Sequence, residues 1–274
     1  MSLKQSPSSA KVGLVLTGGG ARAAYQVGVL QAIAAMLPEG TRNPFPVICG
    51  TSAGAVNAAS LALSARNFHE GVRQLSTVWE NAHVNQAYRS DPIGVFGNVA
   101  RWLASLLLGG LGRRNAVSML DNSPLAQLLE RSLPLRGIQR SIETGALHAL
   151  GITAWGYTSG QSVTFYQGAD SIVPWKRERR IGIPAHIGLE HLMASSAIPL
   201  LFPAARLNRE FFGDGSMRQL APISPALHLG AERVLVIGVR KTADTQPERV
   251  RVDSYPTLAQ IAEHFMGSIF LDRK

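Results

Sequence analysis

Apolar runs and helical stripes alternate through the first 65 residues of the chain. Residues 12–16 form a short apolar run that is typical of a buried strand, and three consecutive glycines break it at residues 18–20. From residue 21 to residue 37 apolar side chains recur at helical spacing, and a second apolar run at residues 46–49 precedes a helical pattern at about residues 52–65. This order, with short connections, predicts two parallel strands joined by a right-handed crossover.

The second half of the chain predicts further strands and helices. Apolar and polar residues alternate at residues 152–157 and 162–167 around a Thr-Ser-Gly-Gln turn, which predicts a hairpin. We also expect a helix at residues 189–197, a tight hairpin at residues 205–212 followed by Gly213-Asp214-Gly215, a helix at residues 222–229, a strand at residues 234–239 and a last helix around residues 258–265. The pattern of residues 84–148 is less regular.

Composition indicates one globular domain. The chain has 274 residues, of which 46% are hydrophobic and 16% charged. This is enough to bury one large core, and one domain over residues 12–274 is expected. Residues 1–11 lack the apolar segment of a secretory signal and are predicted to be a disordered lead-in. The single cysteine allows no internal disulfide, so a cytoplasmic location is expected.

The formal net charge of +9 indicates anionic partners, either a membrane surface or nucleic acid. No nucleic-acid-binding motif is recognisable, so we expect no nucleic-acid partner. The densest basic cluster, Lys176-Arg177-Glu178-Arg179-Arg180, is most simply interpreted as a solvated loop.

The glycine-rich loop at residues 18–23 has two interpretations. Its sequence, Gly-Gly-Gly-Ala-Arg-Ala, fits the dinucleotide-binding fingerprint between a strand and a helix. That fingerprint needs an acidic residue at the end of the second strand, but this strand runs into Cys49-Gly50-Thr51-Ser52 and Glu39 precedes it. Alternatively, the free N–H groups of the loop bind a negative oxygen. Because parallel strands end at one edge of a sheet, the loop is expected beside Ser52, which favours an oxyanion hole.

The pentapeptide Gly50-Thr51-Ser52-Ala53-Gly54 matches the nucleophile elbow G-x-S-x-G. It lies between a predicted strand and a predicted helix, where Gly50 and Gly54 would allow a sharp turn that exposes the serine hydroxyl. Helix capping is the plainer role for Ser52, since serine is a good N-cap. Together with the glycine loop upstream, the pattern favours Ser52 as a nucleophile.

A serine hydroxyl needs a base to accept its proton. Of the seven histidines, only His228 and His264 follow the tight hairpin, and both fall inside predicted helices instead of the loop expected for a triad histidine. Asp214 fits better, because it ends a predicted strand between two glycines, where backbone can approach closely. An ordinary Asp-Gly turn is the alternative.

These three loops together resemble the patatin-like phospholipase family. The resemblance rests on Gly18-Gly19-Gly20-Ala21-Arg22 as oxyanion loop, Gly50-Thr51-Ser52-Ala53-Gly54 as nucleophile elbow and Asp214-Gly215 as the second member of a Ser–Asp dyad. Residues 194–204, ASSAIPLLFPA, are also similar to the family's segment ahead of the aspartate. Ser216 departs from the Gly or Ala that the family often has there. The chain stops soon after its last predicted helix, so a truncated C-terminal end is expected.

The resemblance implies a three-layer α/β/α fold with a mostly parallel central sheet. It also implies hydrolysis of acyl esters of phospholipids or other lipids, with Ser52 as nucleophile, Asp214 as base and backbone N–H groups of the glycine loop as oxyanion hole. No metal and no other cofactor is required. A soluble carboxylesterase or thioesterase with the same dyad and a non-catalytic lipid-binding protein are the alternatives. No oligomeric state is predicted.

The apolar stretch at residues 95–111 carries Arg101 and the glycine pair Gly109-Gly110. It is shorter than the about 20 residues that span a bilayer, so no transmembrane helix is predicted. Two interpretations stay open for it. It is either a mobile apolar flap beside Ser52 that contacts an anionic membrane peripherally, or an ordinary core helix.

Overall fold

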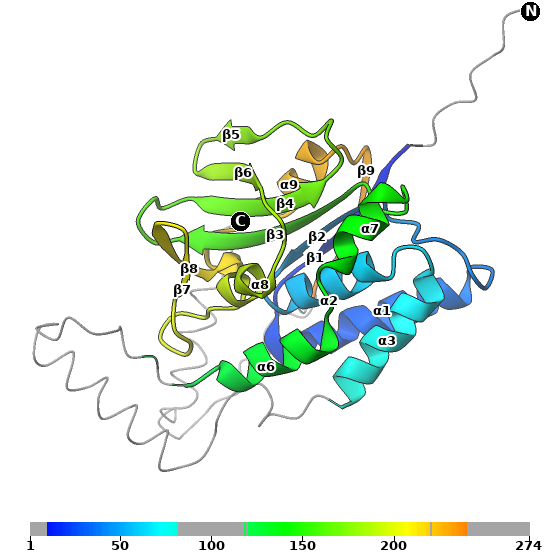
Figure 1. Cartoon of the computed structure of the whole chain (residues 1–274), viewed down its shortest axis with the longest axis horizontal. Helices are drawn as coiled ribbons and strands as arrows, with labels where there is room; N and C mark the ends of the chain where they lie inside the picture. Colours follow the sequence, from blue (N-terminus) through cyan, green and yellow to red (C-terminus); the bar gives the residue numbers. More distant parts are fainter. Residues whose placement is uncertain (1–9, 82–117, 119, 220, 240–274) are drawn as a thin grey trace, which may run out of the picture.

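The computed structural model describes residues 10–81, 118, 120–219 and 221–239, and its centre is a nine-stranded mixed sheet (Figure 1). The strands are β1 (Val12–Leu16), β2 (Val47–Thr51), β3 (Ala149–Gly156), β4 (Ser162–Gly168), β5 (Trp175–Arg177), β6 (Arg180–Pro184), β7 (Ala205–Leu207), β8 (Glu210–Asp214) and β9 (Arg233–Ile237). Their order is β5-β6-β4-β3-β2-β1-β9, with β8 paired to β3 and β7. Strands β9, β1, β2 and β3 run parallel, so their carboxyl ends share one edge, here called the carboxyl edge.

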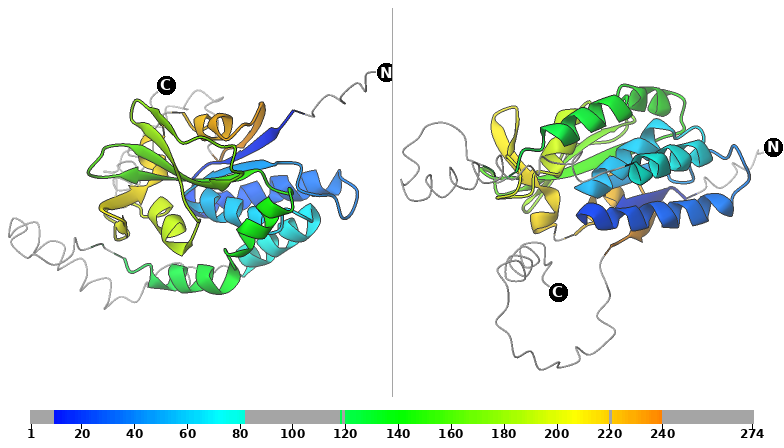
Figure 2. Two further views of the ribbon diagram at one scale, coloured as in Figure 1. Left: turned by 45° about the horizontal axis from the view of Figure 1, so that its top comes forward. Right: turned by 90° about the horizontal axis from the view of Figure 1, so that it is seen from below.

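Helices cover both faces of the sheet and produce three layers (Figure 2). They are η1 (Gly20–Ala23), α1 (Ala24–Ala35), α2 (Ala53–Leu63), α3 (Phe68–Glu80), α6 (Ser123–Ser132), α7 (Gly137–Glu143), α8 (Leu189–Ser195), η2 (Gly215–Arg218) and α9 (Ser224–His228). One core contains side chains from α1, α2, α3, α6, α7 and α8, whereas α9 packs on the other face. This is the three-layer α/β/α fold that the resemblance implied.

Successive side chains of the buried strands point to opposite faces of the sheet, which explains the two cores. On β1, Leu14 and Leu16 belong to the large core, while Val15 between them packs on the α9 side. Cys49 on β2 also faces the α9 side and is 3% exposed, and its burial raises the pKa of the thiol to about 12. The central strands are therefore apolar on both faces, as parallel strands between two helical layers must be.

Strand β8 occupies the edge of β3 that β2 leaves unpaired. β2 pairs with β3 as far as Thr51, which lies opposite Thr153, and the chain then turns into α2. Ala154 comes next on β3 and pairs on this same edge with Asp214, the last residue of β8, because its other edge pairs with β4. The residue after Thr51 and the end of β8 are thereby brought side by side at the carboxyl edge.

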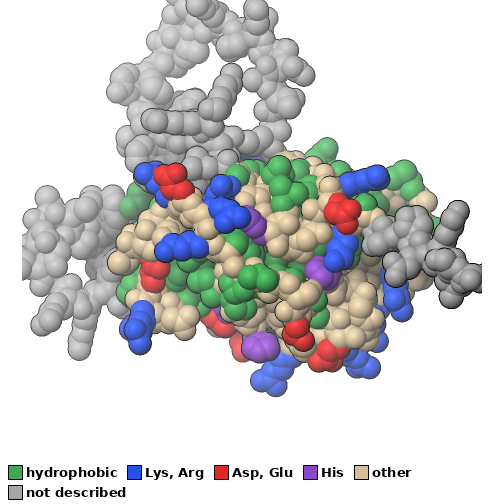
Figure 3. Space-filling view, turned by 90° about the horizontal axis from the view of Figure 1, so that it is seen from above, with side chains coloured by type: hydrophobic (Ala, Val, Ile, Leu, Met, Phe, Trp, Pro, Cys, Tyr) green, Lys and Arg blue, Asp and Glu red, His purple; other side chains and the backbone are tan. Residues whose placement is uncertain are grey.

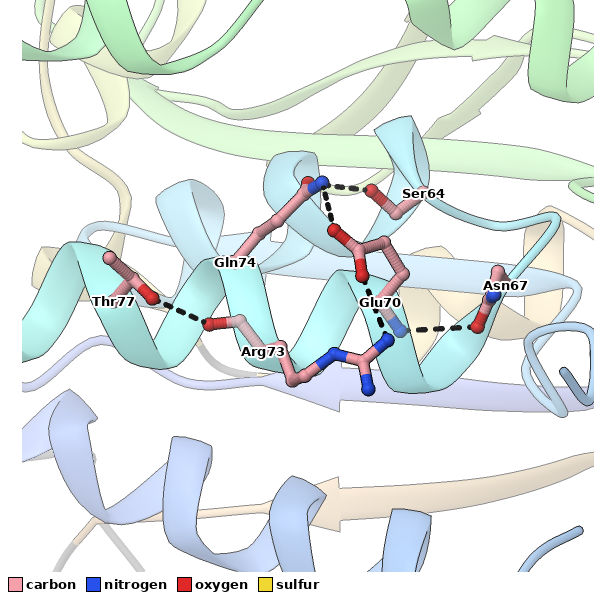
Figure 4. Close-up of polar contacts among 6 residues, drawn as sticks. All are labelled: Ser64, Asn67, Glu70, Arg73, Gln74 and Thr77. Atoms are coloured by element: carbon pink, nitrogen blue, oxygen red, sulfur yellow. Dashed lines mark hydrogen bonds and ion pairs between the residues drawn. The ribbon is translucent and has the colours of Figure 1, made fainter. Parts of the chain in front are cut away.

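Helix α3 does not follow from the sequence predictions above, although its first turn carries a recognisable cap. Asn67 Oδ1 accepts the N–H of Glu70 at 3.1 Å (Figure 4). The Glu70 carboxylate then accepts hydrogen bonds from Arg73 and Gln74, and Gln74 accepts one from the Ser64 hydroxyl. An Asn followed three residues later by a Glu is a start signal for a helix.

Most predicted strands and helices are confirmed with shifted ends, and some predictions are wrong. The helix predicted from residue 21 begins as the 3-10 helix η1, and the hairpin at residues 152–167 is β3 and β4. The basic cluster at residues 176–180 is not simply a loop, because it forms the β5–β6 hairpin. The less regular stretch contains α6 and α7. Residues 1–9, 82–117 and 240–274 lie outside the described residues, and with them the lead-in, the 95–111 stretch and the last predicted helix.

Charged side chains are spread over the surface. Figure 3 shows Lys and Arg side chains around the face that lies at the top of Figure 1, with Asp and Glu side chains among them. Lys176, Arg177 and Arg179 of the β5–β6 hairpin are exposed. Among the helices that the structure describes, none has the length and apolar character needed to cross a bilayer.

Candidate active site

Ser52 and Asp214 form a buried hydrogen-bonded pair at the carboxyl edge. The Ser52 hydroxyl donates to Asp214 Oδ2, with 2.6 Å between the two oxygens, and the residues are 5% and 1% exposed. A hydroxyl that donates to a carboxylate at this distance makes a strong, charge-assisted bond. The arrangement supplies what a serine nucleophile needs, a base positioned to accept the hydroxyl proton.

Ser52 lies in the sharp turn between β2 and α2 with φ 55° and ψ −130°, a backbone conformation that residues with a side chain rarely adopt. The flanking glycines allow this turn. A Cβ on Gly50 would clash with the Gly54 backbone, and a Cβ on Gly54 would clash with the Leu16 backbone. The Ser52 side chain makes no capping hydrogen bond to α2, so its hydroxyl is not used as a helix cap.

Two hydrogen-bond donors hold the Asp214 carboxylate, and burial raises its pKa. Oδ2 accepts the Ser52 hydroxyl, and Oδ1 accepts the N–H of Ser216 at 2.8 Å. Burial raises the pKa of Asp214 from its ordinary 3.8 to about 6, while the hydrogen bonds from Ser52 and Ser216 oppose the increase. The carboxyl is therefore mostly ionised at neutral pH, yet it is more basic than an exposed aspartate.

The glycine loop lies against this pair. A Cβ on Gly18 would clash with Ser216 Oγ and would lie 3.0 Å from Ser52 Cβ. A Cβ on Gly19 would clash with the Val239 side chain. Only residues without a side chain allow the loop to approach so closely, which places the predicted oxyanion loop beside the predicted nucleophile.

Backbone groups of the same loop are available to a ligand. Within the described ranges, the amide N–H groups of Gly18 and Gly19 donate to no other residue. Gly20 has a φ of 54°, in the left-handed region that favours glycine. Ala21 and Arg22 are exposed, and the Arg22 N–H donates to the Gly19 carbonyl at 3.1 Å. The two unused N–H groups can therefore act as hydrogen-bond donors.

No histidine of the described ranges hydrogen-bonds to Ser52 or Asp214. His228 in α9 instead stacks on Trp175, with 4.8 Å between ring centroids. His264 lies outside the described residues. The described part of the chain also contains no group of three or more His, Cys, Asp or Glu side chains that could hold a metal ion.

Polar residues that the sequence analysis did not single out support the pair. Ser195 Oγ accepts the N–H of Ser52 at 2.8 Å, and Gln219 Nε2 donates to Thr51 Oγ1 at 2.9 Å. Gln26 of α1 is fully buried and donates to the carbonyls of Thr17 and Ile237, at the ends of β1 and β9. The sequence indicated that Gln26 could be buried, since it lies next to the apolar stripe of its helix. Ser195 lies in the segment of residues 194–204 that resembles the family, but nothing in the sequence indicated the hydrogen-bond partner of Ser195 or of Gln219, because these partners are more than 100 residues away in the chain.

A groove of about 730 Å³ lies away from the pair, between α6, α7 and the start of α8. Gln167 in its lining pairs with Leu150 near the start of β3. The groove therefore lies at the edge of the sheet opposite the carboxyl edge, and it does not contain the Ser52–Asp214 pair.

The chain is similar to solved structures of larger proteins. VipD from Legionella pneumophila is 14% identical with a TM-score of 0.43, over 76% of this chain and 46% of VipD. Full-length ExoU from the type III secretion system of Pseudomonas aeruginosa, solved in complex with SpcU, is 18% identical with a TM-score of 0.33, over 59% of this chain and 35% of the other. The chain thus spans less than half of the length of these structures. No curated protein matches it.

A family model covers most of the chain. The model for patatin-like phospholipase matches residues 14–227. This range contains the glycine loop, the turn at Ser52 and Asp214. The chain therefore belongs to the patatin-like phospholipase family of lipid acyl hydrolases.

Proposed function

We propose that the protein is a serine-dependent lipid acyl hydrolase that cleaves carboxylic esters through a Ser52–Asp214 dyad. The hydrogen bond of 2.6 Å between Ser52 Oγ and Asp214 Oδ2 carries this proposal. Family membership supports the reaction class, and the unused N–H groups of the glycine loop support the acyl-transfer chemistry.

The first half-reaction forms an acyl-enzyme. Ser52 Oγ attacks the ester carbonyl carbon while its proton passes to Asp214 Oδ2, and the carbonyl oxygen becomes a tetrahedral oxyanion. The intermediate collapses, the bond to the leaving alcohol breaks, and the alcohol takes the proton from Asp214. A pKa of about 6 suits Asp214 to this exchange near neutral pH, because the group can both accept and return a proton.

The second half-reaction regenerates the enzyme. A water molecule attacks the acyl carbon of the Ser52 ester while Asp214 accepts the water proton. The new tetrahedral intermediate then expels Ser52 Oγ, which takes the proton back from Asp214, and the carboxylic acid leaves. Every proton is returned, so the dyad needs no other reactant than water.

We assign the oxyanion hole to backbone donors on both sides of Ser52. The glycine loop contributes N–H groups, of which those of Gly18 and Gly19 donate to no other described residue. Ala53 is the first residue of α2, so its N–H has no partner within the helix. The positive N-terminal end of α2 adds to the stabilisation of the developing charge. This extends the predicted loop of residues 18–22 by one donor from the elbow itself.

The proposed substrate is a phospholipid or another acyl lipid. Peripheral contact with an anionic membrane from the cytoplasm belongs to the same proposal, and the net charge of +9 supports it. A water-soluble ester or thioester is the competing substrate class.

A fluorophosphonate probe, followed by mapping of the labelled peptide, tests the proposal. We expect labelling at Ser52 alone, no labelling of Ser52→Ala, and loss of turnover in Asp214→Asn. Hydrolysis should be faster on phospholipid vesicles than on a short soluble ester or thioester. Labelling of a different serine would falsify the dyad, and turnover of soluble esters alone would replace the lipid substrate.

A further inference from the structure

The main-chain N–H of Ser52 needs a hydrogen-bond acceptor of its own, apart from the acceptor of the hydroxyl. The turn at Ser52 takes this N–H out of the β2–β3 ladder, and the residue is buried. A buried N–H without an acceptor costs about 1–3 kcal/mol, so the fold must supply one. The acceptor is the hydroxyl oxygen of Ser195, at 2.8 Å from the Ser52 nitrogen.

The orientation of the Ser195 hydroxyl is fixed by both of its hydrogen bonds. Ser195 is the last residue of α8 and is 0% exposed. Its hydroxyl donates to the Thr153 carbonyl at 2.6 Å while it accepts the N–H of Ser52. Since an N–H can only donate and a carbonyl can only accept, the hydroxyl has one possible arrangement. Ser195 thus joins the turn at Ser52 to the β3 position where β2 ends.

The same end of α8 also holds the other member of the pair. The carbonyl of Ala197, two residues after Ser195, accepts the N–H of Asp214 at 2.8 Å. Helix α8 lies between α2 and the β7–β8 hairpin (Figure 1). Ser195 and Ala197 therefore hydrogen-bond to the backbone of Ser52 and of Asp214, respectively, and together they set how the two side chains face each other.

We infer that Ser195 is a positioning residue for the nucleophile: its hydroxyl holds the Ser52 backbone so that Ser52 Oγ points at Asp214 Oδ2. This rests on the proposed function for its effect on catalysis. The structural basis is independent of that function, because it consists of two buried hydrogen bonds. Displacement of a reacting group by about 1 Å can cost about 100-fold in rate, so a small relaxation of the turn is enough to matter.

The neighbouring serine provides a matched control. Ser196 is also buried, at 8% exposed, and its hydroxyl has no hydrogen-bond partner among the described residues. Ser195→Ala and Ser196→Ala thus remove the same atom from adjacent buried positions. Only the first change removes hydrogen bonds, from the N–H of Ser52 and from the carbonyl of Thr153.

Steady-state kinetics on a short soluble ester test the inference. We expect Ser195→Ala to lower kcat by about 10- to 100-fold with KM within about twofold, and Ser196→Ala to stay within about twofold of wild type in both. Ser195→Cys keeps the shape of the side chain, but its sulfur is larger than the hydroxyl oxygen and forms only weak hydrogen bonds, so this variant should be slow as well. Equal kcat for Ser195→Ala and Ser196→Ala, or full activity of Ser195→Cys, overturns the inference.

The pH profile separates positioning from general destabilisation. The Ser52 hydrogen bond lowers the pKa of Asp214, so its loss in Ser195→Ala should raise the apparent pKa of the acid limb of kcat/KM. A less stable but correctly arranged site would keep that pKa, and an unchanged value therefore counts against the inference.

A crystal structure of Ser195→Ala or Ser195→Cys tests the geometry without any assay. We expect Ser52 Oγ to lie beyond hydrogen-bonding distance of Asp214 Oδ2 in the variant. An intact bond overturns the inference even if the wild-type protein proves to hydrolyse nothing. An inactive wild type with a displaced Ser52 in the variant would instead reject the proposed function and retain the positioning role.

Discussion

Gln26 and Asn57 are joined by a hydrogen bond of 2.9 Å between their side chains, and both residues are completely buried. Gln26 Nε2 donates to the carbonyls of Thr17 and Ile237, at the ends of β1 and β9. Asn57 Nδ2 donates to Gln26 Oε1 and, more weakly, to the Ala23 carbonyl. The pair therefore connects the nucleophile helix α2 to both ends of the glycine loop.

Asn57→Ala should destabilise the fold by about 2–4 kcal/mol. The indole N–H of Trp79 donates to Asn57 Oδ1 at 2.8 Å, and Asn57 Nδ2 donates to the Ala23 carbonyl. The substitution removes both hydrogen bonds in a mostly buried place. Urea denaturation measures the effect. Asn81→Ala is the control, because Asn81 is exposed and its side chain donates, within the described residues, only to the Thr77 carbonyl, and it should cost less than about 0.5 kcal/mol. Equal losses in the two variants would contradict the role given to this network.

Gly18→Ala should lower kcat by at least about 100-fold, because its methyl group would push Ser52 and Ser216 out of place. Adding Ser216→Gly removes one of the two clashes and should restore part of the loss. Gly28→Ala is the control, since nothing lies within 4 Å of a Cβ at this exposed position of α1. It should leave kcat unchanged and stabilise the helix by about 0.5–1 kcal/mol. Hydrolysis of a soluble ester and thermal unfolding report the two effects.

Activity should fall in acid because Asp214 must be ionised to accept the serine proton. The pKa of about 6 predicts that kcat/KM is constant above about pH 7 and decreases tenfold for each pH unit well below 6. A profile measured from pH 4.5 to 8.5 with a soluble ester gives the apparent pKa. A value near 4 would mean that the carboxyl is solvated during turnover, against the burial described here.

The same carboxyl should make the wild-type fold less stable as pH rises. Asp214 binds its proton more tightly in the folded protein than in the unfolded chain, so protonation of Asp214 stabilises the fold. This stabilisation is fully present below about pH 4, decreases as the pH rises through 6, and is absent above that range. The loss is on the order of 3 kcal/mol, at about 1.4 kcal/mol per pKa unit. Asp214→Asn does not titrate, so the unfolding free energy of wild type minus variant should decrease between pH 4 and pH 8. A constant difference over that range would show that the pKa is not raised.

The parallel strands and the elbow could be predicted from the sequence because their signals are local. The apolar run of β2, the two glycines and the small residues of α2 lie within about 20 residues, although the contact that requires Gly54 is with the Leu16 backbone, further away in the chain. Asp214 could be proposed for a similar reason, since its strand end and flanking glycines are adjacent. The 2.6 Å contact with Ser52 could not, because it depends on β8 pairing with β3 beyond the end of β2.

The supporting polar residues were harder to foresee. Ser195 and Ser196 are identical in a sequence, and only the tertiary structure gives one of them two partners and the other none. The hairpin of β5 and β6 was missed because its basic composition is typical of solvated turns. Helix α3, in contrast, had a usable signal in Asn67 and Glu70, three residues apart.

Because Cys49 is buried, a cysteine introduced at the nucleophile position can be alkylated selectively. Cys49 is the single cysteine of the sequence, and a thiol with a pKa of about 12 that is shielded from solvent does not react with alkylating reagents at neutral pH. A thiol placed at position 52 by Ser52→Cys would sit at the N-terminal end of α2, only three residues further along the chain. Any alkylation of the Ser52→Cys variant by iodoacetamide would then report on position 52, without any need to remove the native cysteine.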